Sequence, residues 1–103
     1  MTMQTMQTVL LEPDTHLRIR YSVPRNGLIE FTVEAGGAPV DTYILDEEGL
    51  KEFNKGGDVS YYGGFTNRYE HHQELRLPFR GSWYLLIVNR NSQPVAVHYD
   101  VSG

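Results

Sequence analysis

The stretch LRIRYSVPRNGLIEFTVE, from Leu17 to Glu34, decides the fold class of this chain. Apolar residues alternate with polar ones on both sides of a central turn sequence, at Leu17, Ile19, Tyr21, Val23, Ile29, Phe31 and Val33. A period of two places alternate side chains on one face of a half-buried sheet. The turn sequence Pro24-Arg25-Asn26-Gly27 has the proline and Asn-Gly chemistry of tight turns. The stretch therefore predicts two β-strands joined as a hairpin.

Strand patterns continue outward from this stretch in both directions. Further strands are predicted over residues 5–11, 40–45, 59–65, 69–79, 83–88 and 95–101. The run from Trp83 to Val88 is apolar on both faces, which is typical of a central strand, whereas Pro78 indicates a sheet edge. Asp46 resembles a helix N-cap, so we expect one short helical turn near 47–54. About eight short strands separated by turn signals predict an all-β, antiparallel, jelly-roll-like β-sandwich.

Length and composition narrow the possible classes of protein. A chain of 103 residues predicts one domain over residues 1–103, in which residues 1–7 are expected to fray. A net charge of −4 and the absence of a Lys/Arg cluster argue against nucleic acid as a partner. The sequence has no leader pattern and no apolar run of about 20 residues, so we expect no membrane contact and a cytoplasmic location. The lack of cysteine excludes disulfides and thiolate metal sites.

The histidines and acidic residues do not form a recognisable metal motif. His71 and His72 are adjacent in a predicted strand, so they point to opposite faces and cannot chelate one ion unaided. We expect solvated strand histidines and no metal. The acidic residues Asp41, Asp46, Glu47, Glu48 and Asp58 lack the spacing of an EF-hand loop. An acidic first helical turn explains most of them without an ion.

No motif for covalent or cofactor chemistry occurs in the sequence. It has no nucleophile elbow, phosphate-binding loop or dinucleotide fingerprint, and its glycine pairs lie between predicted strands. We therefore expect a protein that is not an enzyme and binds no cofactor. The less favoured alternative is a metal-dependent or hydrolytic enzyme in which His71, His72 or His98 meets a distant carboxylate.

The segment around Tyr61 is the strongest candidate for a contact surface. The candidate binding residues are Tyr61, Tyr62, Phe65, Asn67, Arg68 and Tyr69. Aromatic side chains beside the flexible Gly63-Gly64 pair offer large amphipathic anchors and close backbone approach. We predict a non-catalytic module that docks a protein partner or self-associates through this loop. The alternatives are a small-molecule or carbohydrate-binding sandwich, and a purely structural role in which Tyr62 and Phe65 plug the open end of the sandwich.

Several short motifs of the chain match a known family. These motifs are Leu45-Asp46, Phe53, Tyr62-Gly63-Gly64, Pro78, Gly81 and Trp83-Tyr84. On these residues the chain, over roughly 40–101, resembles the bacterial β-sandwich family of unknown function numbered 1883. The Gly-x-Trp-Tyr start of a late strand and a Tyr-x-Val ending are weakly similar to pre-peptidase C-terminal and Golgi-dynamics (GOLD) domains. The resemblance implies a bacterial accessory or interaction domain, and it carries over no catalytic residue.

Overall fold

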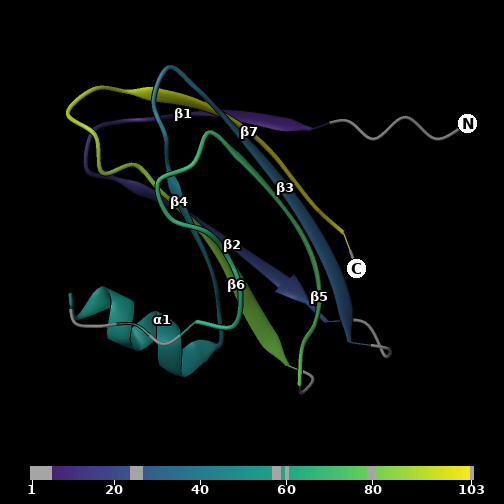
Figure 1. Cartoon of the computed structure of the whole chain (residues 1–103). Helices are drawn as coiled ribbons and strands as arrows, with labels where there is room; N and C mark the ends of the chain where they lie inside the picture. The colour runs from purple at the N-terminus through teal and green to yellow at the C-terminus, as the bar shows by residue number, and fades with distance from the viewer. Residues whose placement is uncertain (1–5, 24–26, 57–58, 60, 79–80, 103) are drawn as a thin grey trace, which may run out of the picture.

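The computed structural model describes residues 6–23, 27–56, 59, 61–78 and 81–102 (Figure 1). Within these ranges the chain forms seven strands and one helix. They are β1 (Gln7–Leu11), β2 (His16–Ser22), β3 (Leu28–Gly36), β4 (Asp41–Leu45), α1 (Glu47–Asn54), β5 (Glu70–Arg76), β6 (Ser82–Val88) and β7 (Val95–Ser102). The strands pair antiparallel in one sheet of order β1-β7-β3-β5 and a second of order β2-β6-β4. The prediction of an all-β, antiparallel sandwich is confirmed.

The inner faces of the two sheets pack on each other. Strands β3, β6 and β7 supply most of the side chains that are almost completely buried there: Ile29, Phe31, Val33, Trp83, Leu85, Ile87, Val95 and Val97. They occupy the alternate positions that a period of two places on one face. Burial of each such side chain contributes roughly 1.5–3 kcal/mol to stability. The alternation in the sequence thus sets which residues hold the sheets together.

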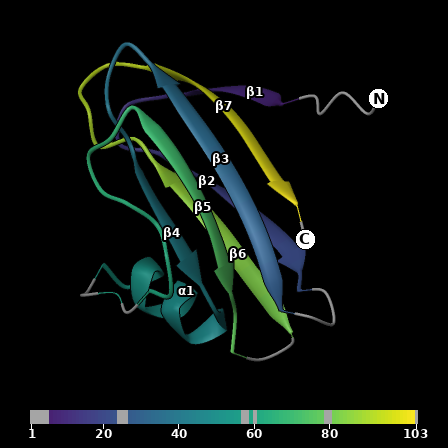
Figure 2. The same ribbon diagram turned by 45° about the vertical axis from the view of Figure 1, so that its right-hand side comes forward.

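Helix α1 packs on the outer face of the second sheet over β4 and β6, and it lies next to β4 (Figure 2). Its Leu50 and Phe53 join an apolar cluster with Leu86 of β6. Asp46 caps the helix, because its carboxylate accepts a hydrogen bond of 2.8 Å from the backbone N–H of Gly49. β6 lies between β2 and β4 and is buried on both faces. The predictions of a central strand and of a short helix in this part of the chain are confirmed.

The predicted hairpin over residues 17–34 is wrong. β2 pairs with β6, whereas β3 pairs with β5 and β7, so the connection carries the chain from one sheet to the other. Residues 24–26 of the turn lie outside the described residues, and Gly27 has a φ of 75°. Turn chemistry signals a chain reversal, but it does not specify which sheet the next strand joins.

The described residues of the range 59–65 do not form the predicted strand; Ser60 lies outside the described residues. In place of a strand, this part of the chain forms an isolated bridge between Gly63 and Ile44 of β4, and the Phe65 carbonyl accepts a hydrogen bond from the Thr42 N–H. Gly64 has a φ of 117°, and a Cβ atom there would overlap the carbonyl group of Thr42. The glycine pair therefore serves a close backbone approach, and seven strands replace the expected eight.

The first strand and the edge strand β5 test two further predictions. The expected fraying of residues 1–7 does not extend to Gln7, because Gln7 of β1 pairs with Tyr99 of β7. Residues 1–5 lie outside the described residues. β5 is an edge strand that ends at Arg76, two residues before Pro78, as the proline predicts. None of the described residues belongs to a helix that is long and apolar enough to cross a membrane.

Candidate functional site

The aromatic segment, which we define as residues 61–69, runs along the edge of β4. The backbone N–H of Tyr62 donates to the carbonyl of Ile44 at 2.9 Å. At the other end of the segment, the N–H of Val40 donates to the carbonyl of Arg68 at 3.0 Å. The segment is therefore anchored to a sheet edge, where it covers backbone groups that β4 would otherwise expose.

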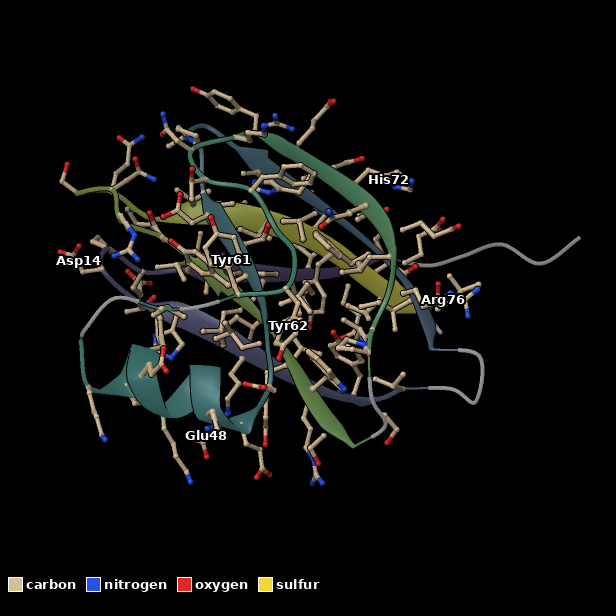
Figure 3. All side chains as sticks on the ribbon, turned by 60° about the horizontal axis from the view of Figure 1, so that its bottom comes forward. Asp14, Glu48, Tyr61, Tyr62, His72 and Arg76 are labelled. Atoms are coloured by element: carbon tan, nitrogen blue, oxygen red, sulfur yellow. The ribbon has the colours of Figure 1, made fainter. Side chains whose placement is uncertain are left out.

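Tyr61 and Tyr62 present fixed aromatic surfaces to solvent. Their side chains are 48% and 46% exposed, respectively. The ring of Tyr61 packs edge-on against Tyr43 with centroids 5.2 Å apart, and the ring of Tyr62 packs edge-on against Trp83 at 4.7 Å. Both lie on the side of the molecule that carries α1 and Glu48 (Figure 3). Because each ring is held by another ring, a ligand would meet surfaces that are already ordered.

A cavity of about 410 Å³ lies where β4, α1 and the aromatic segment meet. We call it the aromatic cavity, and it is lined by Tyr43, Phe53, Gly56, Val59, Tyr61, Thr66 and Arg90. The Tyr43 and Phe53 rings are tilted by 48° with centroids 6.3 Å apart. Three rings from three different elements therefore form apolar walls, and the Arg90 guanidinium supplies a charged group at the same cavity.

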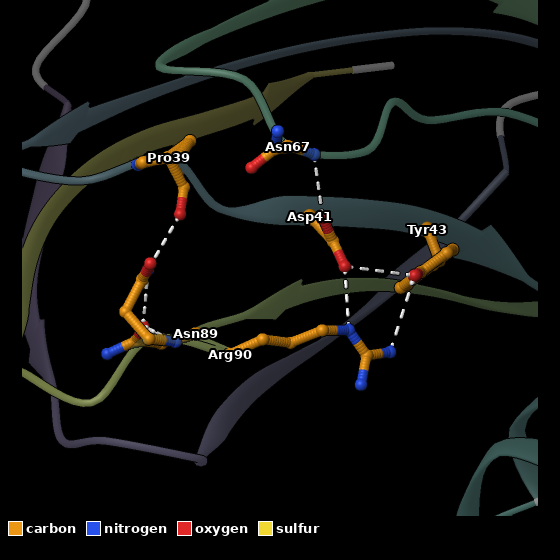
Figure 4. A network of polar contacts seen from close by, with 7 residues as sticks. Pro39, Asp41, Tyr43, Asn67, Asn89 and Arg90 are labelled. Atoms are coloured by element: carbon orange, nitrogen blue, oxygen red, sulfur yellow. Dashed lines mark hydrogen bonds and ion pairs between the residues drawn. The ribbon is translucent and has the colours of Figure 1, made fainter.

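Arg90 is oriented by Asp41 and Tyr43. Its Nε donates to Asp41 Oδ2 at 2.7 Å, and its Nη2 donates to the Tyr43 hydroxyl at 3.4 Å. The Tyr43 hydroxyl donates to Asp41 Oδ2 at 3.2 Å, while the backbone N–H of Asn67 donates to Oδ1 at 2.7 Å (Figure 4). The hydrogen bonds to Tyr43 and Asp41 raise the pKa of Arg90, so the guanidinium stays protonated.

The side chain of Asn89 fixes the backbone turn that carries Arg90. The buried Asn89 amide donates to the carbonyls of Leu11 at 3.0 Å and Gln93 at 2.9 Å, and its Oδ1 accepts from the Asn91 N–H at 2.9 Å. Asn89 thus fixes the turn after β6 to the end of β1. The guanidinium of Arg90 therefore projects from a rigid turn, which limits the freedom lost when a ligand binds.

A second concavity of about 240 Å³ lies on the other side of Tyr61. We call it the acidic hollow, and it is lined by Asp46, Glu48, Gly49, Glu52, Tyr61 and Tyr62. The Tyr62 hydroxyl donates to Asp46 Oδ2 at 3.3 Å. Tyr61 borders both concavities, one of which carries a guanidinium and the other carboxylates.

The structure divides the predicted binding residues into two groups. Tyr61 and Tyr62 border the concavities, and Asn67 contributes its backbone N–H to Asp41. Asn67 and the other three lie outside both linings: Arg68 stacks 4.3 Å above the Phe65 ring, and Tyr69, 53% exposed, accepts a backbone hydrogen bond from Ala35. The aromatic segment therefore does not present its six predicted residues as one surface.

Sequence reasoning did not predict Tyr43, Phe53 and Arg90 as binding residues. One signal was present: Asp41 and Tyr43 lie two apart in the otherwise uncharged run 40–45, so both share a face, and a carboxylate in a buried strand needs a partner. The sequence does not indicate that Arg90 is this partner, because the contact between Asp41 and Arg90 depends on the pairing of β4 with β6.

His71 and His72 lie on opposite faces of β5, as predicted. The expectation that both are solvated is wrong for His71, which opposes Val33 on the inner face and is 1% exposed. Its Nε2 lies 2.9 Å from the Arg68 carbonyl, which only accepts, so Nδ1 accepts the Thr42 hydroxyl at 2.9 Å. Burial lowers the pKa of His71, which favours this neutral form.

The other two relevant histidines lie on the outer face of the first sheet. His72 is exposed and contacts the Thr32 hydroxyl at 3.0 Å, and His98 contacts the Thr8 hydroxyl at 2.8 Å. In the described ranges, no three His, Asp or Glu side chains converge in a way that would hold a metal ion.

Comparisons with known proteins add no family: no protein-family model matches the chain, and no curated protein matches it. The resemblance to the family numbered 1883 stays a prediction.

Proposed function

We propose that this protein is a non-catalytic binding module that holds a small ligand in the aromatic cavity. The observation that carries the proposal is a cavity of about 410 Å³ with three ring walls and one oriented guanidinium. Small-molecule sites commonly have volumes of about 300–1,000 Å³, with aromatic side chains and a few placed polar groups in the lining. This favours the small-ligand alternative over protein docking for this part of the surface.

The polar groups at the cavity support binding rather than reaction. The Asp41 carboxylate already accepts hydrogen bonds from Arg90, Tyr43 and Asn67, so it is a poor general base. Among the described residues that line the cavity, none is a histidine or a carboxylate. The side chains available there can contact and orient a ligand, but they offer no proton acceptor of the usual kind.

Thermal shift with a fragment library of neutral, anionic and cationic members tests this proposal. A ligand that binds only the folded protein raises its melting temperature by mass action. Tyr61→Ala should abolish the shift, because it removes one wall of the cavity. Tyr69→Ala is the matched control, since Tyr69 is a similarly exposed tyrosine of the same segment that lies outside the cavity lining. A library with no stabilising member, or equal loss in both variants, would refute the proposal.

Protein docking at the acidic hollow is a second candidate, favoured by the exposure of Tyr62 beside Asp46, Glu48 and Glu52. Exposed aromatic anchors with a carboxylate rim suit a partner that presents Lys or Arg. The test is to identify a co-purifying protein from the native host and then measure its binary affinity. Glu48→Lys should weaken that affinity, and Tyr69→Ala should not. A partner that binds both variants equally well would exclude the hollow as its site.

A further inference from the structure

We infer that the ligand of the aromatic cavity is a carboxylate attached to a six-membered ring, with the carboxylate paired to Arg90 and the ring packed against the walls that Tyr43, Phe53 and Tyr61 form. This inference rests on the proposed function, because it names the class of ligand for the same cavity. It is carried by the hydrogen-bonding capacity that Arg90 retains, by the charge of the cavity lining and by the arrangement of the rings.

The first step concerns the two edges of the guanidinium. Arg90 uses its Nε and Nη2 toward Asp41 and Tyr43, so that side of the planar group is occupied and its orientation is set. Nη1 points away from both partners in Figure 4, and it pairs with no residue in the described part of the chain. The edge formed by Nη1 and the second proton of Nη2 therefore remains for a ligand. Two parallel N–H donors on one edge match the two oxygens of a carboxylate.

The second step concerns charge. The described lining of the aromatic cavity includes Arg90 and no Asp or Glu, whereas the neighbouring acidic hollow is lined by Asp46, Glu48 and Glu52. A cationic ligand would therefore meet the guanidinium in the lining, while the Asp41 carboxylate that compensates it already accepts hydrogen bonds from Arg90, Tyr43 and Asn67. Any acceptor gains charge-assisted hydrogen bonds from the guanidinium, but only a carboxylate pairs two charged oxygens with its two parallel donors. Asp41 offsets one unit of the Arg90 charge, so the preference for an anion comes from the two-donor edge of the guanidinium and not from net charge.

The third step concerns the body of the ligand. The Tyr61 ring stands at 70° to Tyr43, and Phe53 is tilted by 48° to Tyr43, so the walls offer ring faces and edges in different directions. A flat or chair-shaped six-membered ring can place its faces or its C–H edges against such walls. Two sources share this chemistry, an aromatic acid and a sugar acid, and both carry a carboxylate directly on the ring.

The test is a titration of the isotope-labelled protein, followed by backbone and Arg side-chain NMR, with benzoate, benzamide, glucuronate and glucose. We expect benzoate or glucuronate to shift the resonances of the cavity residues and of the Arg90 Nη groups, while benzamide and glucose bind about tenfold more weakly or not at all. Binding of benzoate alone would assign an aromatic acid, and binding of glucuronate alone would assign a sugar acid.

The matched variant is Arg90→Lys, which keeps a cation beside Asp41 but lacks the two-donor edge. Acid affinity should fall about tenfold or more in this variant, and its melting temperature reports whether it still folds. The Nη resonances of the unmodified protein give a second readout that needs no variant.

Two results would overturn the inference while leaving the proposed function in place. One is equal binding of benzamide and benzoate, or of glucose and glucuronate. The other is failure of all four probes while neutral or cationic fragments of the library bind in a manner that depends on Tyr61. If no fragment of any charge binds, both the inference and the proposed function are refuted.

Discussion

The outer face of the β2-β6-β4 sheet is apolar over β4 and β6, where α1 covers it, and polar over β2, whereas the outer face of the β1-β7-β3-β5 sheet is polar and has no helix on it among the described residues. On the covered face, Leu50 of the helix is 8% exposed and Leu86 is fully buried. On the exposed face, Leu10 is 59% exposed, and His72 projects from the side of the molecule opposite Glu48 (Figure 3). The two sheets share one core but face different surroundings.

The difference explains where the aromatic cavity and the acidic hollow lie. Two sheets stacked face to face leave no space between them at their packed centre. A helix that packs on one sheet leaves grooves along its sides, which we call seams. The aromatic cavity and the acidic hollow both lie at the seams where α1 meets the aromatic segment. The polar face has no third layer among the described residues, and it therefore lacks seams of this kind. A third layer, rather than the sandwich itself, provides the candidate site.

The largest expected effect comes from weakening the covered face. Leu50→Ala removes a buried side chain that fixes α1 on β6, so the free energy of unfolding should fall by about 2–4 kcal/mol. Urea denaturation measures this change. The matched control is Leu10→Ala on the exposed face, where the change should stay within about 0.5 kcal/mol. Similar losses at both positions would mean that the two faces do not differ in the way proposed.

The fold was largely predictable because alternation is a local signal. Strands such as β3 and β7 follow from residues two apart, and the helix follows from the capping chemistry of Asp46. The connection at residues 24–27 was wrong because pairing is a property of the whole sandwich. A turn signal is the same whether the next strand joins its predecessor or crosses to the other sheet.

The candidate site was only partly predictable, for a related reason. Tyr61 and Tyr62 stand out as adjacent aromatic residues, and the structure places both at concavities. Arg90 lies in an unremarkable polar turn, and it reaches the cavity only because β4 and β6 are neighbours. Burial of His71 could not be distinguished from exposure of His72, because alternation shows that the two differ but not which of them faces inward.

His71 and His72 give the next expected effect, on the pH dependence of stability. Above pH 6.5 His71 is neutral in both the folded and the unfolded chain, and its contribution to stability is complete. Burial lowers the pKa of His71 in the folded state, so below pH 6.5 the unfolded chain binds a proton first. The free energy of unfolding should therefore fall as the pH drops from 6.5 to the folded pKa.

Two substitutions separate this effect from other titrations. His71→Gln keeps a donor for the Arg68 carbonyl and an acceptor for Thr42, so it should flatten the fall, whereas His72→Gln should leave it intact. His71→Leu leaves the buried Thr42 hydroxyl without its acceptor, while the Arg68 carbonyl keeps the Val40 N–H, and should cost about 1–3 kcal/mol at neutral pH. Denaturation curves over a pH series measure these differences. An unchanged pH profile in His71→Gln would show that another group controls it.

The smallest expected effect tests the charge pattern of the exposed face. Glu34 of β3 lies directly opposite Glu70 of β5, and like charges directly opposite each other in a sheet repel. Glu70→Lys replaces this repulsion with attraction, so the free energy of unfolding should rise by roughly 0.2–1 kcal/mol, and the gain should shrink at high salt. Glu12→Lys is the control, since Glu12 is exposed in a turn and has no opposite strand position. If both substitutions give the same gain, the cause is the reduced net charge of the protein, and the polar face is tolerant of its charges rather than strained by them.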